Sequence, residues 1–148
     1  MLSRKLNVLF LCTGNSCRSQ MAEGWARAIQ GDVLNAYSAG ITTHGLNPNA
    51  VKVMTEVGVD ISGQTSKTSS ALADVPFDYV ITVCGHAHET CPTWLGQNAK
   101  VVHVGFDDPP KLAAAETDPE KALNHYRRVR DEIAAFVRTL PEVLPQLK

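Results

Sequence analysis

Short apolar runs and amphipathic stretches alternate along this chain. The apolar runs lie between turn signals and predict buried strands. They span residues 5–11, 33–39, 77–84 and 99–106. The amphipathic stretches, in which apolar residues recur every three or four positions, predict helices. They span residues 17–30, 47–58 and 118–140. Alternating strands and helices favour right-handed crossovers, so the pattern predicts an α/β fold with a parallel sheet covered on both faces.

Three polar loops follow predicted strands. They comprise residues 12–19, 84–91 and 106–109. Ligands of parallel α/β sheets bind beyond the carboxyl ends of the strands. We therefore expect these three loops to gather at one edge of the sheet and to form the functional site.

Composition sets the class of protein. A chain of 148 residues with 44% hydrophobic and 20% charged residues is expected to form one globular domain, residues 1–148. The net charge of −1 offers no electrostatic attraction for nucleic acid or an anionic membrane. The apolar run at 7–12 is too short for a membrane span or a signal peptide. We expect a cytoplasmic monomer without nucleic-acid or membrane partners.

Four long or aromatic side chains have a simple structural interpretation. Trp25 is expected to pack in the core. Arg127, Arg128 and Arg130 are expected to form a solvated face of the last predicted helix. None of them is assigned to the chemistry.

The four cysteines point toward chemistry. In a reducing compartment a stable disulfide is unusual, and cysteines are more often catalytic, redox-active or metal-binding. Buried packing remains the alternative for each of them. For Cys17, on the first predicted helical turn, we expect packing.

The stretch "CTGNSCRS" at 12–19, here named the anion loop, joins a strand to a helix. Backbone amides at such a junction, together with the positive end of the helix dipole, attract a tetrahedral oxyanion. The expected oxyanion-binding residues are Thr13, Gly14, Asn15, Ser16, Cys17 and Arg18. The loop lacks the glycine patterns of mononucleotide and dinucleotide sites.

Within the anion loop, Cys12 is the predicted nucleophile. A helix N-terminus and an arginine favour the thiolate form of cysteine. Arg18 supplies a planar, bidentate donor for two oxyanion oxygens. The hydroxyl of Ser19 is placed to donate to the thiolate. Gly14 is expected to supply a backbone conformation denied to larger residues, and Asn15 to tie the loop's own backbone.

Several blocks of the sequence together resemble one family. They are "CTGNSCRSQMAEGWARA", "YSAGITTHGLNP", "DIS" with "TS" shortly after it, "CGHAHETC", "GFDDP" and "RVRDEI", within residues 6–138. The chain resembles the thioredoxin-coupled arsenate reductases, which share the low-molecular-weight protein tyrosine phosphatase fold. The resemblance implies a single three-layer domain with a four-stranded parallel sheet flanked by helices, and a role in arsenic detoxification.

The second cysteine pair, Cys84 and Cys91, carries the implied relay. Seven residues on a helix would separate the two by about 10.5 Å along the axis, so a disulfide between them requires a backbone rearrangement. Gly85 and the polar residues after it would let the segment unwind. The resemblance implies that Cys12 attacks arsenate, that Cys84 attacks the adduct and releases arsenite, and that Cys91 takes over the disulfide for reduction by thioredoxin. Glutaredoxin or a small thiol remains an alternative reductant.

Asp108 is the candidate proton donor, because it precedes Pro109 as in the Asp-Pro loop of the related phosphatases. Asp107 is a helper or a surface charge. The alternative function is a low-molecular-weight phosphatase that acts through a cysteinyl phosphate. The segment "PKLAAAE" after the Asp-Pro pair lacks the aromatic residues that surround a phosphotyrosine ring. Weak phosphatase activity is expected as a side reaction.

A metal-binding redox module is a third interpretation. Cys84, His86, His88 and Cys91 are suitable zinc ligands, but their spacing is not that of a zinc knuckle. We therefore expect no metal to be required.

Some of the reductases hold a potassium ion near the anion loop. The matching positions here are Asn15, Glu23, Ser38 and Thr65, and the last one, a carboxylate in those reductases, is Lys67. The charge reversal makes a bound potassium ion doubtful, and the hypothesis is that the ammonium of Lys67 takes its place.

Overall fold

The computed structural model describes residues 5–85, 89 and 99–144. Its sheet contains β1 (Leu6–Cys12), β2 (Leu34–Gly40), β3 (Tyr79–Thr82) and β4 (Lys100–His103). The strands pair in parallel in the order β2-β1-β3-β4. All four predicted strands are confirmed, although the third and fourth are shorter than expected at both ends.

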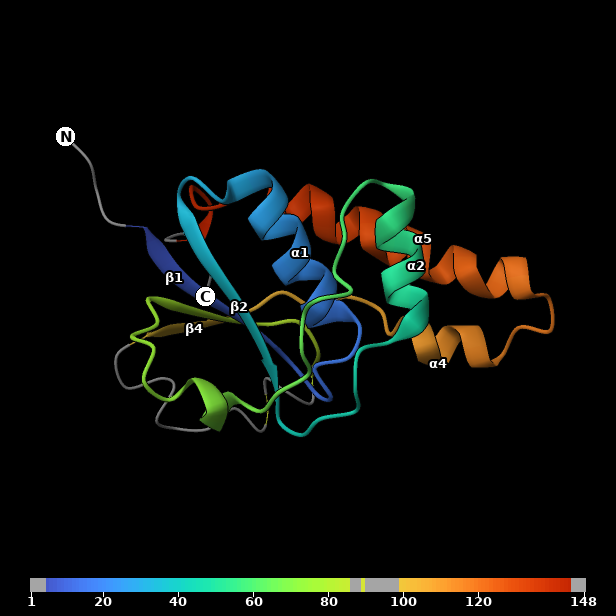
Figure 1. Ribbon diagram of the computed structural model, residues 1–148, viewed down its shortest axis with the longest axis horizontal. Helices are drawn as coiled ribbons and strands as arrows, with labels where there is room; N and C mark the ends of the chain where they lie inside the picture. Colours follow the sequence, from blue (N-terminus) through green and yellow to red (C-terminus); the bar gives the residue numbers. More distant parts are fainter. Residues whose placement is uncertain (1–4, 86–88, 90–98, 145–148) are drawn as a thin grey trace.

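The predicted helices are confirmed as α1 (Arg18–Gln30), α2 (Pro48–Glu56) and α5 (Pro119–Val137). They pack against one another and lie together beside the sheet (Figure 1). Asn47 caps α2, with its side-chain oxygen accepting from two backbone amides, and Pro48 occupies the first turn. Within the described residues no helix is long and apolar enough to cross a membrane.

Two short elements escape the periodicity argument. They are the 3-10 helix η1 (Ser69–Leu72) and α4 (Pro109–Ala114). α4 has six residues, too few to show a hydrophobic period, and it follows Asp108 directly. It packs against α5, which ties the Asp-Pro segment to the rest of the fold.

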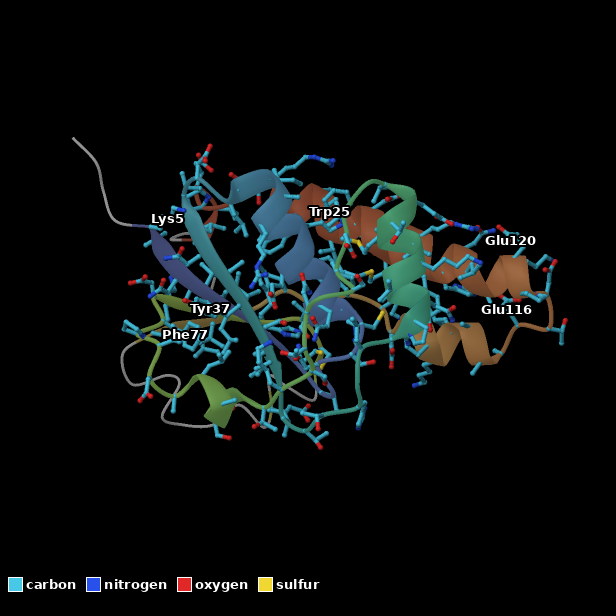
Figure 2. The ribbon with its side chains drawn as sticks, viewed as in Figure 1. Lys5, Trp25, Tyr37, Phe77, Glu116 and Glu120 are labelled. Atoms are coloured by element: carbon cyan, nitrogen blue, oxygen red, sulfur yellow. The ribbon has the colours of Figure 1, made fainter. Side chains whose placement is uncertain are left out.

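The core centres on β1, whose residues Val8–Leu11 are fully buried. The ring of Tyr37, on β2, lies edge-on to that of Phe77 with centroids 5.4 Å apart, and Figure 2 shows the two side chains next to each other. Trp25 is buried, as predicted, and its Nε1 donates to the backbone oxygen of Arg130 at 3.1 Å. This bond joins α1 to α5.

The expectation of a fully solvated arginine face is wrong for Arg130. Its side chain is buried, Nη1 donates to the oxygen of Val53 at 2.9 Å, and the same nitrogen lies 3.1 Å from Glu56. The reason is that α2 packs on this side of α5, which no local pattern in α5 reveals. Arg127 and Arg128 remain at the surface, in ion pairs.

Glu56→Gln should lower the free energy of unfolding at neutral pH and have no effect in strong acid. Hydrogen bonds from Arg127, with a smaller contribution from Arg130, hold the pKa of Glu56 below 4.5, its ordinary value. Because the folded-state pKa is lowered, the stabilisation is fully present above the unfolded-state pKa and disappears as the pH falls through the folded-state value. Urea titrations at pH 7 and at pH 2 to 3 measure this difference.

Glu132→Gln is the matched control, since Glu132 pairs with the exposed Arg128 and should contribute little at either pH. A destabilisation by Glu56→Gln of equal size at both pH values would contradict the expected linkage.

Candidate functional site

The anion loop opens onto a cavity of about 300 Å³. The cavity is lined by Cys12, Thr13, Gly14, Ser16, Cys17, Arg18, His44, Asn47, Asp108 and Pro110. Thr13 Oγ1 lies 3.2 Å from Cys84 Sγ, and Arg18 Nη1 donates to the oxygen of Phe106 at 3.1 Å. The described parts of the three polar loops therefore gather at one edge of the sheet, as predicted.

Cys12 is buried at the end of β1, and its sulfur lies 2.8 Å from the hydroxyl oxygen of Ser19. The expected contact is thus present. Asn15 Nδ2 donates to the same hydroxyl oxygen at 2.8 Å. A thiolate on Cys12 can only accept, so Ser19 donates to it while Ser19's own oxygen accepts from Asn15. This arrangement stabilises the negative charge of a nucleophilic sulfur.

The roles expected for Gly14 and Asn15 need correction. The left-handed residue of the loop is Asn15, with φ of 47°, a conformation that asparagine tolerates better than most residues. Gly14 is required for space, because a β-carbon there would collide with the ring of His44. Asn15 also does not tie the loop's own backbone, since its Oδ1 accepts from the backbone N–H of Lys67 at 2.9 Å.

Cys17 is buried at the start of α1. Burial raises the pKa of its thiol, the nearby Cys12 raises that pKa further, and Arg18 opposes the shift. A protonated, buried thiol is unreactive. This environment agrees with the packing role expected for Cys17.

Arg18 and Asp108 face each other across the mouth of the cavity, with Nη2 3.7 Å from Oδ2. Asp107 does not line the cavity, and its carboxylate pairs with Arg128 of α5 at 2.9 Å. The structure therefore separates the two neighbouring carboxylates, of which only Asp108 lines the cavity. The side chain of Asp108 is 41% exposed, so it can exchange protons with water.

Cys84 is buried just beyond β3, next to the anion loop. Cys91, His86 and His88 lie outside the described residues. In the described part of the chain, no three His, Cys, Asp or Glu side chains are grouped so that they could hold a metal ion.

The positions that match a potassium site surround the buried carboxylate of Glu23. Ser38 donates to its Oε1 at 2.5 Å, and Arg27 lies 2.6 Å from its Oε2. The ammonium of Lys67 donates to the oxygen of Thr65 at 2.9 Å and lies 4.0 Å from Glu23 Oε1. Burial lowers the pKa of Lys67, and Glu23 opposes that shift. The residues present do not fit a potassium ion, because the ammonium of Lys67 already lies beside two of the same oxygens, those of Thr65 and Glu23.

Sequence reasoning missed Pro110 of α4 and two polar side chains that line the cavity, His44 and Asn47. Both belong to the stretch between β2 and α2, whose backbone is bonded to the anion loop through His44 N to Gly14 O at 2.9 Å and Asn47 N to Ser16 O at 3.0 Å. The stretch "THGLNP", part of one of the blocks that carry the family resemblance, was the signal that could have identified them.

Comparisons with known proteins place the chain. The family model described as low molecular weight phosphotyrosine protein phosphatase matches residues 7–147. The arsenate reductase of Halalkalibacterium halodurans is 54% identical over 135 residues, which cover 91% of this chain and 94% of that protein. The arsenate reductase of Bacillus subtilis is 50% identical, with the same coverage.

The solved structures that resemble this fold agree with these relatives. An arsenate reductase in the phosphate binding state superposes with a TM-score of 0.75, at 31% identity, and the match covers 97% of this chain and 99% of that one. An arsenate reductase in the oxidized state superposes with a TM-score of 0.73, at 32% identity, over 90% and 95% of the two chains. The chain therefore belongs to the low molecular weight phosphotyrosine protein phosphatase family and, within it, to the arsenate reductases.

Proposed function

We propose that this protein reduces arsenate to arsenite through a cysteine relay that thioredoxin resets. The observation that carries the proposal is the position of Cys84, whose sulfur lies 3.2 Å from Thr13, the residue after the nucleophile Cys12. A phosphatase of this fold needs one thiol in its anion loop. A second thiol beside that loop is what a reductase needs.

The first step forms a bond between sulfur and arsenic. Arsenate has the shape and charge of phosphate, so the loop amides and the guanidinium of Arg18 can hold its oxygens. The thiolate of Cys12 attacks arsenic, and one arsenate oxygen is protonated and leaves as water. Asp108, which lies beside Arg18 at the cavity, is the proposed proton donor.

The second step transfers two electrons. The sulfur of Cys84, as a thiolate, attacks the sulfur of Cys12, so that a disulfide forms and the bond between sulfur and arsenic breaks. The electron pair of that bond remains on arsenic, which leaves as arsenite. Cys91 then attacks Cys84 and frees Cys12. Two thiols of thioredoxin reduce the disulfide between Cys84 and Cys91 by thiol–disulfide exchange.

The test is NADPH consumption in the presence of arsenate, thioredoxin and thioredoxin reductase. We expect steady consumption that requires all of these components. Glutaredoxin with glutathione replaces thioredoxin in a parallel assay, and faster turnover there would assign the reductant differently. If neither system consumes NADPH when arsenate is added, the protein is not an arsenate reductase.

The proposed setting is the cytoplasm, where the thiols stay reduced between turnovers, and the proposed working unit is the monomer. The anion loop, Arg18, Cys84 and Asp108 all belong to one chain, so the described site needs no second copy. Light scattering during turnover at micromolar concentration should give a mass near 16.0 kDa.

Phosphatase activity is the second candidate function, favoured by the position of Asp108 at the cavity mouth. Asp108→Asn should lower kcat for p-nitrophenyl phosphate by about 10²-fold or more, because the leaving group loses its proton donor. Asp107→Asn is the matched control and should change kcat little, since Asp107 pairs with Arg128 instead. Equal losses in both variants would show that the effect is not proton donation.

We also propose that Lys67 replaces a bound monovalent cation. Its ammonium is part of the protein and lies beside Thr65 and Glu23, so added potassium has no site to occupy. The melting temperature and kcat/KM should be the same in potassium chloride and in sodium chloride of equal ionic strength. A rise of both quantities with potassium but not with sodium would refute the proposal.

A further inference from the structure

A chain of hydrogen-bonded side-chain amides connects the nucleophile Cys12 to Gln64, a residue of the segment that passes α1. Gln20 Nε2 donates to Asn15 Oδ1 at 3.0 Å, and Asn15 Nδ2 donates to Ser19. Ser19 contacts the sulfur of Cys12. At the other end, Gln64 Nε2 donates to Gln20 Oε1 at 2.8 Å. Gln20 and Asn15 are both completely buried, so their amide groups depend on these partners.

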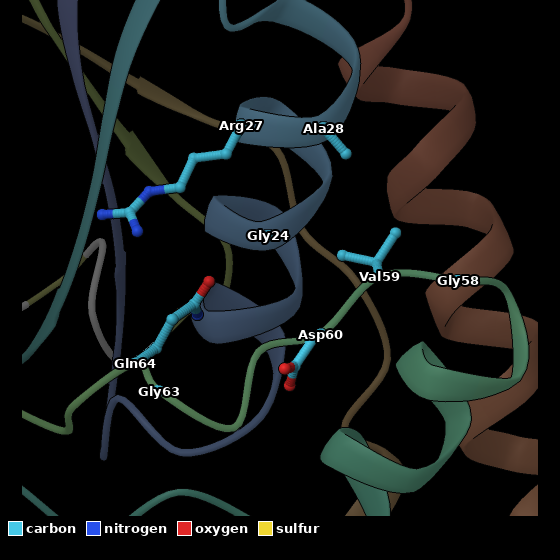
Figure 3. A pocket seen from close by; sticks show the side chains of 8 residues that line it. All are labelled: Gly24, Arg27, Ala28, Gly58, Val59, Asp60, Gly63 and Gln64. Atoms are coloured by element: carbon cyan, nitrogen blue, oxygen red, sulfur yellow. The ribbon is translucent and has the colours of Figure 1, made fainter.

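Gln64 begins this chain at the wall of a second cavity, of about 500 Å³. This cavity lies where residues 58–64 pass α1, and Figure 3 shows Gln64 reaching from that segment toward the helix. Gln64 is half-buried and donates to the backbone oxygen of Gln20 as well, at 3.0 Å. The chain of amides therefore runs from this second cavity to the anion loop.

Backbone groups determine which way each amide points. Gln20 Nε2 also donates to the backbone oxygens of Asn15 and Thr65, both at 3.0 Å, and a carbonyl oxygen can only accept. The amide of Gln20 cannot flip without turning its oxygen toward these two oxygens. Asn15 Oδ1 accepts from the backbone N–H of Lys67, so Asn15 Nδ2 must face Ser19.

We propose that Gln20, supported by Gln64, is a positioning residue that aims Asn15 and Ser19 at Cys12 and so maintains the reactivity of that thiol. Gln20 touches neither the cavity of the anion loop nor the sulfur. It acts by holding Asn15, which has the left-handed backbone conformation at the turn of the loop. Without Gln20, Asn15 Oδ1 keeps only the backbone N–H of Lys67 as its donor, so the Asn15 amide is held less firmly in the position from which it donates to Ser19. The inference rests on the proposed role of Cys12 as nucleophile.

The test measures alkylation of Cys12 by iodoacetamide as a function of pH, in the reduced full chain, with the modified peptide quantified by mass spectrometry. This assay requires no arsenate, so it can fail or succeed independently of the proposed reaction. Gln20→Met keeps the length of the side chain and removes its hydrogen bonds. We expect the midpoint of the pH profile to rise by about one pH unit, the equivalent of one hydrogen bond to a charged group.

Gln30→Met is the matched control. Gln30 lies on the same helix and its Nε2 donates to the oxygens of Val137 and Arg138, at 3.2 and 3.3 Å. The same substitution there removes hydrogen bonds between α1 and α5 without touching the amide chain, so it should leave the midpoint unchanged. A midpoint shift shared by both variants would show that the effect is general destabilisation and would overturn the proposal.

Gln64→Met provides a second variant, because Gln64 is only half-buried and its loss leaves the core intact. It should shift the midpoint in the same direction by a smaller amount. An unchanged profile in folded Gln20→Met overturns the proposal. If Gln20→Met does not fold, the Gln64→Met profile decides, and an unchanged midpoint there overturns it equally.

Discussion

Replacing Cys91 with serine should reduce arsenate turnover to one arsenite per protein molecule, and replacing Cys84 with serine should abolish even that one. In the Cys91→Ser variant, Cys84 can still attack Cys12 and expel arsenite. The protein then stops as a disulfide between Cys12 and Cys84, because the one remaining thiol, that of Cys17, is buried and unreactive. In the Cys84→Ser variant, a hydroxyl replaces the thiol beside Thr13 and no disulfide can form there.

Rapid-quench measurement of arsenite, with mass analysis of the quenched protein, distinguishes the two variants. Cys91→Ser should show a burst equal to the protein concentration and a trapped disulfide between Cys12 and Cys84. Cys84→Ser should show neither. Repeated turnover by Cys91→Ser would mean that another thiol resolves the first disulfide, and the relay as proposed would be wrong. Absent arsenate turnover in the unaltered chain, with aryl phosphatase activity that survives both substitutions, would favour the phosphatase.

Arg18→Lys should lower kcat/KM for arsenate by about 10²- to 10³-fold, the range for removal of a group that stabilises the transition-state oxyanion. A lysine keeps the positive charge but has no planar fork for two oxygens. It also cannot reproduce the present geometry, in which one guanidinium nitrogen donates to Phe106 and another lies near Asp108. Steady-state kinetics with arsenate measure the effect.

Arg128→Lys is the matched control for this substitution. Arg128 pairs with Asp107, the carboxylate next to Asp108, but its side chain is exposed and lies outside the cavity. Its kcat/KM should stay within about twofold of the unaltered chain, as for other exposed ion pairs. If Arg18→Lys behaved like Arg128→Lys, charge alone would hold the oxyanion and the bidentate role of Arg18 would be contradicted.

Local patterns were sufficient for the fold class. The apolar run at 5–11 and the amphipathic repeat at 17–30 predicted β1 and α1 to within a residue or two. A buried strand requires a continuous apolar run, and a helix with one buried face requires apolar residues every three or four positions, so both are visible in the sequence. Among the described residues, the two elements that escaped prediction, η1 and α4, have four and six residues. Elements of that length show no hydrophobic period and depend on the surfaces they pack against.

Local patterns likewise sufficed to propose the nucleophile. The strand-to-helix position of Cys12, with Arg18 six residues on, indicated an oxyanion site without any tertiary information. The sequence of the anion loop also indicated that Ser19 would contact the sulfur of Cys12, because both residues belong to one short loop between a strand and a helix. Chemistry confined to a single loop can be inferred from residue order.

Tertiary structure alone decided the contacts between segments distant in sequence. The burial of Arg130 depends on α2, the pairing of Asp107 with Arg128 depends on α5, and the orientation of Gln20 depends on the backbone at Thr65. In each case a polar group found its partner on a separate element. Buried polar groups must be satisfied, but many residues along a chain can satisfy them, so the pairing is determined only when the packed elements bring one partner within reach.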